Sequence, residues 1–355
     1  MNRRKFIDIM SGKLQTPWAP LWRAAAWAAS GPYAAVMVLR RRLYELGILP
    51  SRKSAVPVIS VGNITTGGTG KTPMVALLAE QLAARGRRPA VLTRGYRGHN
   101  GSGDEPEMLR SLSFGSTGVS PVNRVEVVVN PDRVAGAAQA IAAGADVLVM
   151  DDGFQHLRLR RDLDIVLIDA TNPFGYGHCL PRGLLREPAG VLSRAGLIVI
   201  TRTDELPARQ LSALRGQVDR LSGRRPVALA VHRPQCLSDG DGARLDLAQL
   251  HGKKICAFCG IGNPDSFFAT LERAGASVVE KVAFDDHAQY SPAELEHVIR
   301  AAQNWQADAV VTTAKDRVKL DGRLFARPLW TLQVRMELTE GQELLERALD
   351  SALGK

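Results

Sequence analysis

The residues best suited to chemistry form one short run, Thr65-Thr66-Gly67-Gly68-Thr69-Gly70-Lys71-Thr72. The run follows Val56 to Val61, whose apolar character predicts a buried strand, and precedes Met74 to Arg85, whose periodicity predicts a helix. Glycines placed there let backbone N–H groups surround phosphates that side chains would obstruct. In such a Walker A loop, Lys71 reaches the β- and γ-phosphates and Thr72 ligates Mg²⁺. Only the first position, threonine instead of glycine, departs from the usual pattern.

A second metal anchor is expected at the end of a neighbouring strand. Val147 to Met150 is an apolar run followed directly by Asp151 and Asp152, which is the Walker B arrangement, in which an aspartate binds the metal directly or through water. Together the two motifs predict a site for a nucleoside triphosphate with Mg²⁺. The segment Thr201-Arg202-Thr203-Asp204 loosely imitates the guanine-reading element of GTPases, so ATP is the expected nucleotide and GTP is the alternative.

Predicted strands alternate with predicted helices along most of the chain, which is typical of a parallel sheet covered on both faces. In the first part the further strands are expected at Pro89–Thr93, Val125–Val129, Val147–Met150, Ile165–Asp169 and Leu197–Thr201, and a helix at Asp132–Ala143. In the second part strands are expected at Lys254–Cys259, Ser277–Val282, Ala309–Thr313 and Leu329–Val334, and helices at Pro264–Ala274 and Pro292–Asn304.

The expected fold class is α/β, a P-loop NTPase-like doubly wound parallel sheet with a second, smaller α/β domain and an N-terminal helical segment at a membrane surface. The expected domains are 1–50, the basic Trp- and Ala-rich segment; 51–205, the nucleotide domain; 206–250, a polar connector; and 251–355, the smaller domain.

The net charge of +10 is concentrated near the N-terminus of the 355-residue chain. Residues 1–53 carry ten basic and two acidic side chains, so +8 of the +10 lies there. The remaining residues are nearly neutral, which argues against a nucleic-acid-binding surface on the main body. With 45% apolar and 23% charged residues, the chain is expected to be globular, neither disordered nor a polytopic membrane protein. Four cysteines at irregular spacing fit a reducing cytoplasm.

The basic segment also contains Trp18, Trp22 and Trp27. Tryptophan flanked by arginine suits a membrane interface. The uncharged stretch Ala24 to Leu39 is only 16 residues long and includes Pro32, whereas a bilayer span needs roughly 20 strongly apolar residues. We therefore expect a helix lying on an anionic membrane surface, peripheral or monotopic. The alternative is an amphipathic helix packed on the protein's own core.

Several further motifs, in order along the chain from about 57 to about 319, resemble one known family. They are Ser60-Val61-Gly62-Asn63-Ile64 with the Walker loop and Pro73, Thr93-Arg94-Gly95-Tyr96-Arg97-Gly98, Asp104-Glu105-Pro106, Asp151-Asp152-Gly153-Phe154-Gln155-His156, Pro181-Arg182-Gly183-Leu184-Leu185-Arg186-Glu187-Pro188 and Phe284-Asp285-Asp286-His287. Together they are similar to the tetraacyldisaccharide 4'-kinases, the lipid A 4'-kinases, and they are much more specific than the Walker loop alone.

The resemblance implies a kinase on the cytoplasmic face of the bacterial inner membrane. It implies that ATP and Mg²⁺ are used to phosphorylate the 4'-hydroxyl of a tetraacylated glucosamine disaccharide 1-phosphate, with no nucleic acid and no obligate protein partner. It also implies that Asp104 is the general base, supported by His287 from the other domain. The Walker residues map to Lys71 and Thr72, and the metal and phosphate block to Asp151, Asp152 and Gln155.

Four arginines in Gly- and Pro-containing loops could meet the acceptor's 1-phosphate or the nucleotide, because arginine binds phosphate oxygens in bidentate fashion. They are Arg94, Arg97, Arg182 and Arg186. Ordinary surface charge is the alternative for them. For the whole chain, the alternatives are a membrane-associated P-loop GTPase or ATPase switch and a kinase for a soluble metabolite.

Overall fold

The computed structural model describes residues 3–95, 125–286, 288–320 and 325–354. These residues form two compact units. Unit 1 comprises 3–95, 125–231 and 336–354, and unit 2 comprises the described residues between 232 and 335. Three positions named above, Arg97, Asp104 and His287, lie outside the described residues.

Unit 1 is built on a parallel sheet in which the glycine-rich loop follows an inner strand. The strands pair in the order β3 (Glu126–Val129), β2 (Pro89–Thr93), β4 (Val147–Asp151), β1 (Val58–Asn63), β5 (Leu163–Asp169), β6 (Leu197–Thr201) and β7 (Val227–Ser238). Val61 of β1 lies opposite both Asp151 and Ile165, so the carboxyl ends of three neighbouring strands meet at one edge. Ligands of doubly wound sheets bind at that edge.

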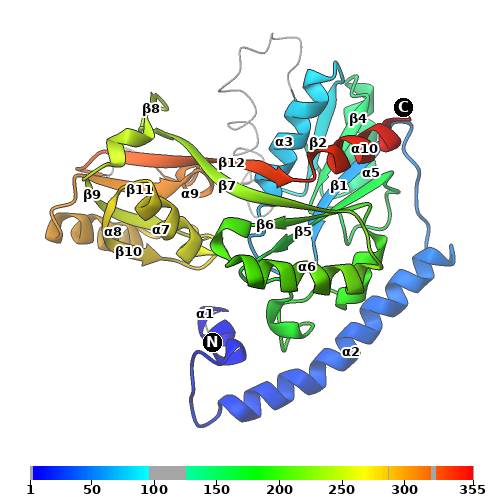
Figure 1. Ribbon diagram of the computed structural model, residues 1–355, viewed down its shortest axis with the longest axis horizontal. Helices are drawn as coiled ribbons and strands as arrows, with labels where there is room; N and C mark the ends of the chain where they lie inside the picture. The colour runs from blue at the N-terminus through cyan, green and yellow to red at the C-terminus, as the bar shows by residue number, and fades with distance from the viewer. Residues whose placement is uncertain (1–2, 96–124, 287, 321–324, 355) are drawn as a thin grey trace. The chain divides into compact units, whose positions relative to one another are not determined.

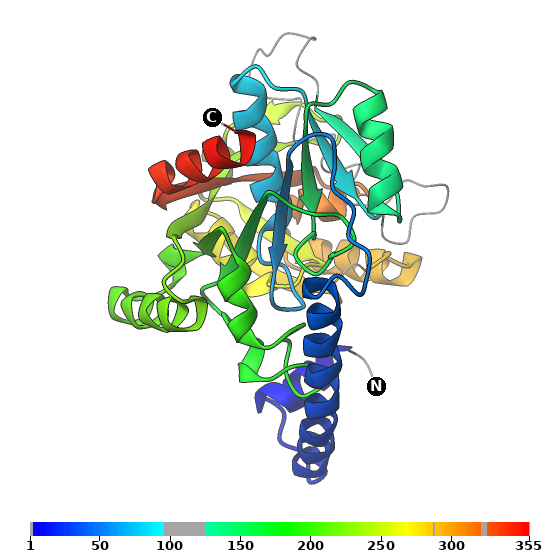
Figure 2. The same ribbon diagram turned by 90° about the vertical axis from the view of Figure 1, so that its right-hand side faces the viewer.

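Both faces of this sheet are covered, as the near-continuous apolar strands predict. On one face, α3 (Lys71–Ala84) and α10 (Gln342–Leu353) pack on Ile59, Val61 and neighbouring alternate residues. On the other face, α5 (Arg133–Ala142) packs on Val58 and its neighbours, and α6 (Ala208–Ser222) and the 3₁₀ helix η4 (Ala189–Arg194) cover β5 and β6. Figure 2 shows α3 and α5 on opposite sides of the strands. The predicted doubly wound architecture is confirmed.

The N-terminal segment forms α1 (Arg3–Ser11) and the long helix α2 (Ala19–Glu45), drawn in blue in Figure 1. Helix α2 continues through Pro32. Side-chain hydrogen bonds connect it to the rest of unit 1. Ser30 Oγ donates to the Cys179 carbonyl at 2.9 Å and Tyr33 Oη to the Arg186 carbonyl at 3.0 Å. A search of the described residues found no helix that is both long and apolar enough to cross a membrane.

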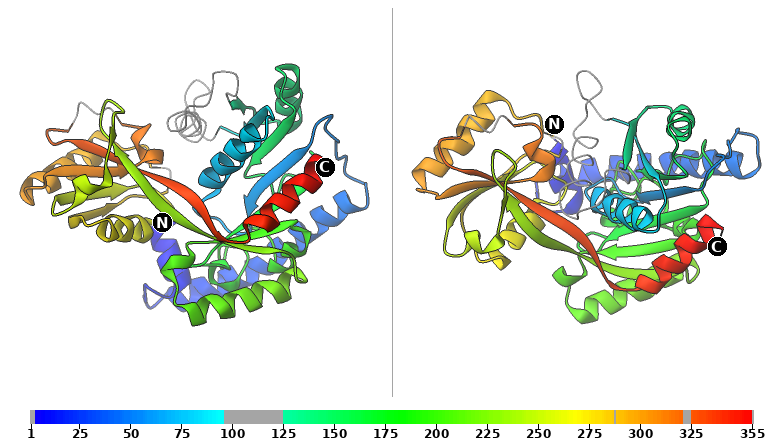
Figure 3. Two further views of the ribbon diagram at one scale, coloured as in Figure 1. Left: turned by 45° about the horizontal axis from the view of Figure 1, so that its top comes forward. Right: turned by 90° about the horizontal axis from the view of Figure 1, so that it is seen from above.

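Unit 2 is a smaller α/β sheet, as expected. Its strands pair in the order β10 (Ser277–Ala283), β9 (Lys254–Cys259), β11 (Ala309–Thr313) and β12 (Leu329–Glu340). Alternate residues of β9 point to opposite faces, so α7 (Pro264–Arg273) packs on one face and α8 (Pro292–Asn304) on the other, as Figure 3 shows. The short helix α9 (Ala314–Arg317) follows β11, and unit 2 also contains β8 (Arg244–Leu245) and η6 (Leu247–Leu250). The minor elements η3 (Gly175–Gly177) and η5 (Thr203–Glu205) belong to unit 1.

The chain is divided differently from the expected domain boundaries. The segment 206–250, expected as a connector, contains α6 and β7, and α6 buries Leu214 and Val218 in unit 1. The C-terminal residues, expected in the smaller domain, return to unit 1 through β12 and α10. Strands β7 and β12 each contribute residues to both units. Unit 2 is thus an insertion within the sequence of unit 1.

Candidate active site

The glycine-rich loop connects the end of β1 to the start of α3, so the predicted strand, loop and helix are present in that order. Gly70 precedes the helix with a φ of +88°, a conformation that glycine adopts without strain. Lys71 and Thr72 are therefore in the first turn of α3, where free backbone N–H groups and the helix dipole favour an anion. Thr66 N donates to the Leu184 carbonyl at 2.8 Å, which ties the loop to the segment before Arg186.

The Walker lysine and the Walker B acids lie together. Asp151, the last residue of β4, is 2% exposed, and its carbonyl accepts a 2.9 Å bond from Arg133 Nη2. Asp152 follows in a left-handed conformation with a φ of +52°, and its Oδ1 lies 3.6 Å from Lys71 Nζ. A non-glycine residue in this conformation is strained, which is common where a functional side chain must be aimed.

Arg186 joins the same group, as its place among the phosphate-binding candidates suggested. Its Nη1 lies 2.8 Å from both carboxylate oxygens of Asp152 and 3.3 Å from Gln155 Oε1. Gln155 in turn donates through Nε2 to the Asn63 carbonyl at 3.0 Å. Five sequence-predicted residues are thus brought to one edge of the sheet from three separate segments: Lys71, then Asp151, Asp152 and Gln155, then Arg186.

The protonation state of Asp152 is set by its two cationic neighbours. Burial by itself would raise the pKa of this carboxyl, but the charges of Lys71 and Arg186 and the Arg186 hydrogen bonds outweigh burial and lower the pKa below its usual value. The group is therefore a carboxylate at neutral pH. Lys71 and Arg186 thus bring two cations to this carboxylate, and cationic side chains of these types also bind phosphate oxygens.

The donor chemistry of this edge fits a magnesium ion bound with a nucleotide. Mg²⁺ takes hard oxygen ligands and uses one or two carboxylates, with phosphates and water completing its shell. Asp151, Asp152 and the Thr72 hydroxyl are such oxygens, at the end of β4 and in the first turn of α3. Among the described residues no group of three or more His, Cys, Asp or Glu side chains converges as a metal cage.

Two other candidate arginines, Arg94 and Arg182, are described by the structure, and neither contacts Asp152 as Arg186 does. Arg94 follows β2 at the same edge of the sheet and is exposed. Arg182 is engaged elsewhere: its Nη1 donates to the Met10 carbonyl at 2.9 Å, and its backbone N–H donates to Ser30 Oγ at 3.1 Å. Arg182 therefore connects the N-terminal helices to the rest of unit 1.

Sequence reasoning did not assign three residues that the structure places at this edge. Asn63 Nδ2 donates to the Gly67 carbonyl at 3.3 Å and to Thr69 Oγ1 at 3.0 Å, while Arg133 supports the end of β4. Glu187 is 3% exposed, and its pKa is raised by burial. Asn63 and Glu187 both stand in motifs that carry the family resemblance, and that was the available signal, but the motifs by themselves indicate no role for either residue.

His156 lies directly after Gln155 and provides a pH test of this region. Burial and the charges of Arg133, Arg94, Arg161 and Arg158 lower the pKa of His156 from 6.5 to about 4. Between those values the unfolded chain binds a proton that the folded protein does not, so the free energy of unfolding falls as pH drops from about 6.5 to about 4. In urea unfolding at pH 7 and pH 5, His156→Gln should lose less stability than the unchanged protein. Equal losses in the two proteins would contradict the assigned pKa.

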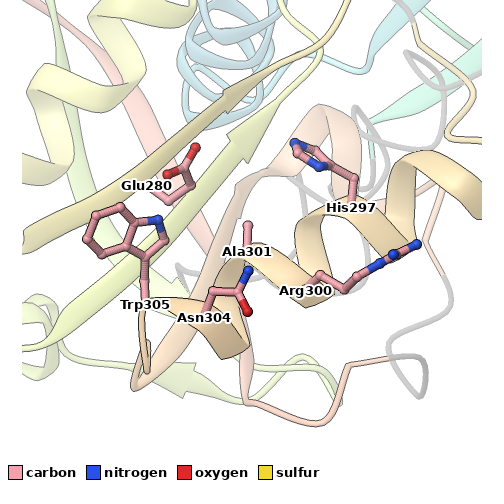
Figure 4. A pocket seen from close by; sticks show the side chains of 6 residues that line it. All are labelled: Glu280, His297, Arg300, Ala301, Asn304 and Trp305. Carbon is pink, nitrogen blue, oxygen red and sulfur yellow. The ribbon is translucent and has the colours of Figure 1, made fainter.

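Two surface pockets occur in the part of the chain that the structure describes. One, of about 680 Å³, adjoins the C-terminal end of α2 and is rich in arginine. The other, of about 490 Å³, is formed by β10 and α8 of unit 2; Figure 4 shows Trp305 and Glu280 on one side of it and His297 on the other. None of the candidate residues lines either pocket. The candidate active site is identified by the P-loop and by the charged side chains of Lys71, Asp152 and Arg186, and not by a pocket.

A doubly wound sheet with a Walker lysine, a Walker B acid and a converging arginine defines a P-loop nucleotide-binding protein. Comparison with known proteins specifies the class further. The family model described as tetraacyldisaccharide-1-P 4'-kinase matches residues 22–354. The chain belongs to this family.

Similar proteins cover most of the chain. A tetraacyldisaccharide 4'-kinase of Anaeromyxobacter sp. (strain K) is 41% identical over 359 residues, which are 95% of this chain and 92% of the relative. One of Syntrophus aciditrophicus is 43% identical over 307 residues, 81% of this chain and 82% of the relative. The crystal structure of LpxK from Aquifex aeolicus in complex with ATP is 27% identical, with a TM-score of 0.68, and covers 92% of this chain and 99% of that one. These matches favour a kinase over a GTPase switch.

Proposed function

We propose that the protein transfers the γ-phosphoryl group of ATP to the 4'-hydroxyl of a tetraacylated glucosamine disaccharide 1-phosphate, a step of lipid A biosynthesis. The observation that carries the proposal is the convergence of Lys71, Asp152 and Arg186 on the P-loop, in a chain whose family and relatives bear the name of this activity. The ATP complex of the similar Aquifex aeolicus protein supports ATP as the donor.

We further propose roles for the residues of the loop and its neighbours. Residues 65–72 bind the nucleotide phosphates, with Lys71 placed to stabilise charge on the transferring group. Asp151, Asp152, Gln155 and Thr72 hold the metal or the water around it. When bound, Mg²⁺ neutralises charge on the phosphate oxygens. Arg186 keeps Asp152 ionised and oriented through its two 2.8 Å contacts.

Asp104 and His287 are proposed as the base and its supporting imidazole. An alcohol that attacks a phosphoryl group must lose its proton during the step, and a carboxylate within hydrogen-bond reach accepts it. A neighbouring imidazole orients that carboxylate and adjusts its pKa. The family resemblance supports this assignment. Arg94 and Arg97, which stand three residues apart in the glycine-containing motif 93–98, are proposed to contact the acceptor's 1-phosphate.

The function is tested by incubating the protein with labelled ATP and a panel of acylated disaccharide 1-phosphates, then locating the new phosphate. Transfer to the 4'-oxygen of tetraacylated acceptors is the expected result, and an acceptor without a free 4'-hydroxyl is the control. Hydrolysis of GTP without any acylated sugar would identify a switch instead. Transfer to an unacylated sugar at an equal rate would identify a kinase for a soluble metabolite.

The acceptor is a lipid, so we propose that unit 1 docks on the cytoplasmic face of the inner membrane through its N-terminal segment. Six large apolar side chains on or just before α2 are each more than half exposed: Trp18, Leu21, Trp22, Trp27, Val36 and Leu39. The same segment carries most of the chain's excess positive charge. Apolar exposure combined with basic charge favours an anionic bilayer surface.

Replacing Trp18, Trp22 and Trp27 together with glutamate should reduce binding to anionic vesicles by about tenfold or more, because each ring loses apolar contact and adds a repelled charge. These side chains are 68%, 51% and 64% exposed, so the fold should tolerate the change. Trp305→Glu is the matched control, since Trp305 is 53% exposed but belongs to unit 2. The measurement is vesicle co-sedimentation without detergent. Undiminished binding by the triple variant would remove this role from α2.

A further inference from the structure

Three successive carbonyl groups of the P-loop are each held by a side chain from the sheet edge. Asn63 Nδ2 donates to the Gly67 carbonyl at 3.3 Å, and Thr201 Oγ1 donates to the Thr69 carbonyl at 3.1 Å. Between them, Arg202 Nη2 donates to the Gly68 carbonyl at 2.9 Å. The donors come from the ends of β1 and β6, so the loop is braced from two strands.

Arg202 is the charged member of this set, and its conformation is unusual. Its side chain is 9% exposed, and its backbone has a φ of +57°, a left-handed conformation that strains a residue with a side chain. Such a conformation persists only where surrounding contacts determine it. At the end of β6 it directs the guanidinium beneath the loop.

Asp169 orients that guanidinium. This carboxylate ends β5, next to Thr201 in the sheet, and forms a hydrogen-bonded ion pair with Arg202 through Oδ2. Its other oxygen, Oδ1, accepts from Thr171 N at 3.0 Å and from Thr171 Oγ1 at 2.7 Å. Both carboxylate oxygens are therefore engaged, and one face of the arginine fork is left to meet Gly68.

The bracing determines which way the loop presents its N–H groups. A trans peptide is planar, so its N–H points away from its carbonyl. Holding the Gly67 and Thr69 carbonyls at the sheet edge turns the N–H groups of Gly68 and Gly70 to the opposite side. Arg202 is neutralised by its ion pair with Asp169, so it acts on the loop through its hydrogen bond to the Gly68 carbonyl, which fixes the carbonyl between the two held by Asn63 and Thr201.

We propose that Arg202, oriented by Asp169, is a positioning residue that pre-organises the P-loop for triphosphate binding. The inference rests on the proposed function and deepens it. The segment Thr201-Arg202-Thr203-Asp204 then has a different role from the guanine-reading element that it resembles. Thr201 and Arg202 donate hydrogen bonds to carbonyls of the P-loop, so this segment positions the phosphate-binding loop and does not recognise a base.

The chain offers a matched control for testing this role. Arg161 and Asp164 form another ion pair, with side chains that are 9% and 11% exposed, the same values as for Arg202 and Asp169. Asp164 lies near the start of β5, whereas Asp169 ends that strand. Arg202→Lys and Arg161→Lys therefore perturb equally buried pairs at opposite ends of one strand.

The experiment measures equilibrium binding of a fluorescent ATP analogue, with thermal unfolding as the check on folding. Arg202→Lys should weaken nucleotide binding by about tenfold or more, because a charge-assisted hydrogen bond to the loop is lost. KM for ATP should rise while KM for the lipid acceptor stays unchanged. Arg161→Lys should lower the unfolding temperature by a similar amount and alter ATP affinity less than about twofold. The ratio of ATP to GTP affinity should be the same in all proteins.

A second variant covers the case in which Arg202→Lys does not fold. Arg202→Met combined with Asp169→Leu removes both charges, so no charge is left buried without its partner. Unchanged ATP affinity in a folded Arg202 variant, or an equal loss in Arg161→Lys, would overturn the inference. A changed preference between ATP and GTP would establish base recognition instead. Absence of nucleotide binding by the unchanged protein would overturn the proposed function itself, before any substitution is compared.

Discussion

Replacing Lys71 with methionine is expected to reduce phosphoryl transfer by about a thousandfold or more, the size of effect found when a cation that stabilises a transferring phosphoryl group is removed. Lys71 occupies the first turn of α3, and its Nζ lies 3.6 Å from Asp152 Oδ1, so it is held at the metal and phosphate edge by an acid of the next motif. Methionine keeps the length of the side chain and removes its charge. The measurement is the rate of label transfer to the tetraacylated acceptor.

Two controls make this result specific to the charge. Lys71→Arg keeps a cation but changes its shape, and it should recover part of the lost rate. The pKa of Asp152 should rise in Lys71→Met, because the charge of Lys71 is a main cause that lowers it. A methionine variant that turns over within a few fold of the unchanged protein would show that the loop does not bind the transferred phosphate.

Replacing Asp104 with alanine is expected to abolish most phosphoryl transfer while ATP binding persists. Loss of a general base costs typically about 10²–10⁴-fold in rate, whereas the proposed nucleotide-binding residues are those of the P-loop, which this substitution leaves unchanged. The two quantities are measured separately, as transfer to the acceptor and as equilibrium binding of the ATP analogue. A rate within a few fold of the original would show that another group accepts the proton.

The His287 variant distinguishes support of the base from the base itself. His287→Ala should reduce the rate less than Asp104→Ala does, and it should shift the pH–rate profile, because an adjacent imidazole alters the pKa of the carboxylate. Effects of the two changes should combine less than additively, since the residues act as a unit.

Strands and helices with dense local signals could be predicted from the sequence with their bounds. The apolar runs Pro89–Thr93, Leu197–Thr201, Lys254–Cys259 and Ala309–Thr313 are β2, β6, β9 and β11 as expected. Helix α8 begins at Pro292 as predicted, because Ser291 and Glu294 form a capping box with Pro292 in the first turn. In these segments local propensity and burial agree.

Contacts between residues far apart in the sequence could not be predicted, although a helix was expected in the N-terminal segment. Helix α6 is polar over most of its surface and buries only a narrow strip that includes Leu214 and Val218, so its composition resembled a connector. Helix α2 continues through Pro32 because its docking on Cys179 and Arg186, far away in the sequence, offsets the missing backbone donor. No local pattern contains that information.

The candidate site shows the same limit. Lys71, Asp151 and Asp152 could be assigned because each stands in a motif whose chemistry depends on order along the chain. The roles of Asn63 and Arg202 could not be assigned, because both residues bind backbone carbonyls of the P-loop. Every residue has a backbone carbonyl, so the sequence does not indicate which one is bound. In the alternative with GTP as the nucleotide, Arg202 belongs to a base-recognition element, because Thr201-Arg202-Thr203-Asp204 imitates the guanine-reading motif of GTPases.

The insertion of unit 2 between two parts of unit 1 has a consequence for biosynthesis. Leu345, Leu349 and Leu353 of α10 pack in the same core as Ile59 and Val61 of β1, the strand that leads into the P-loop. A ribosome therefore releases the last part of the nucleotide-binding core only after all of unit 2 has been made. Domains are usually completed from the N-terminus onward, but this core joins a strand made early, β1, to a helix, α10, that is made only after all of unit 2.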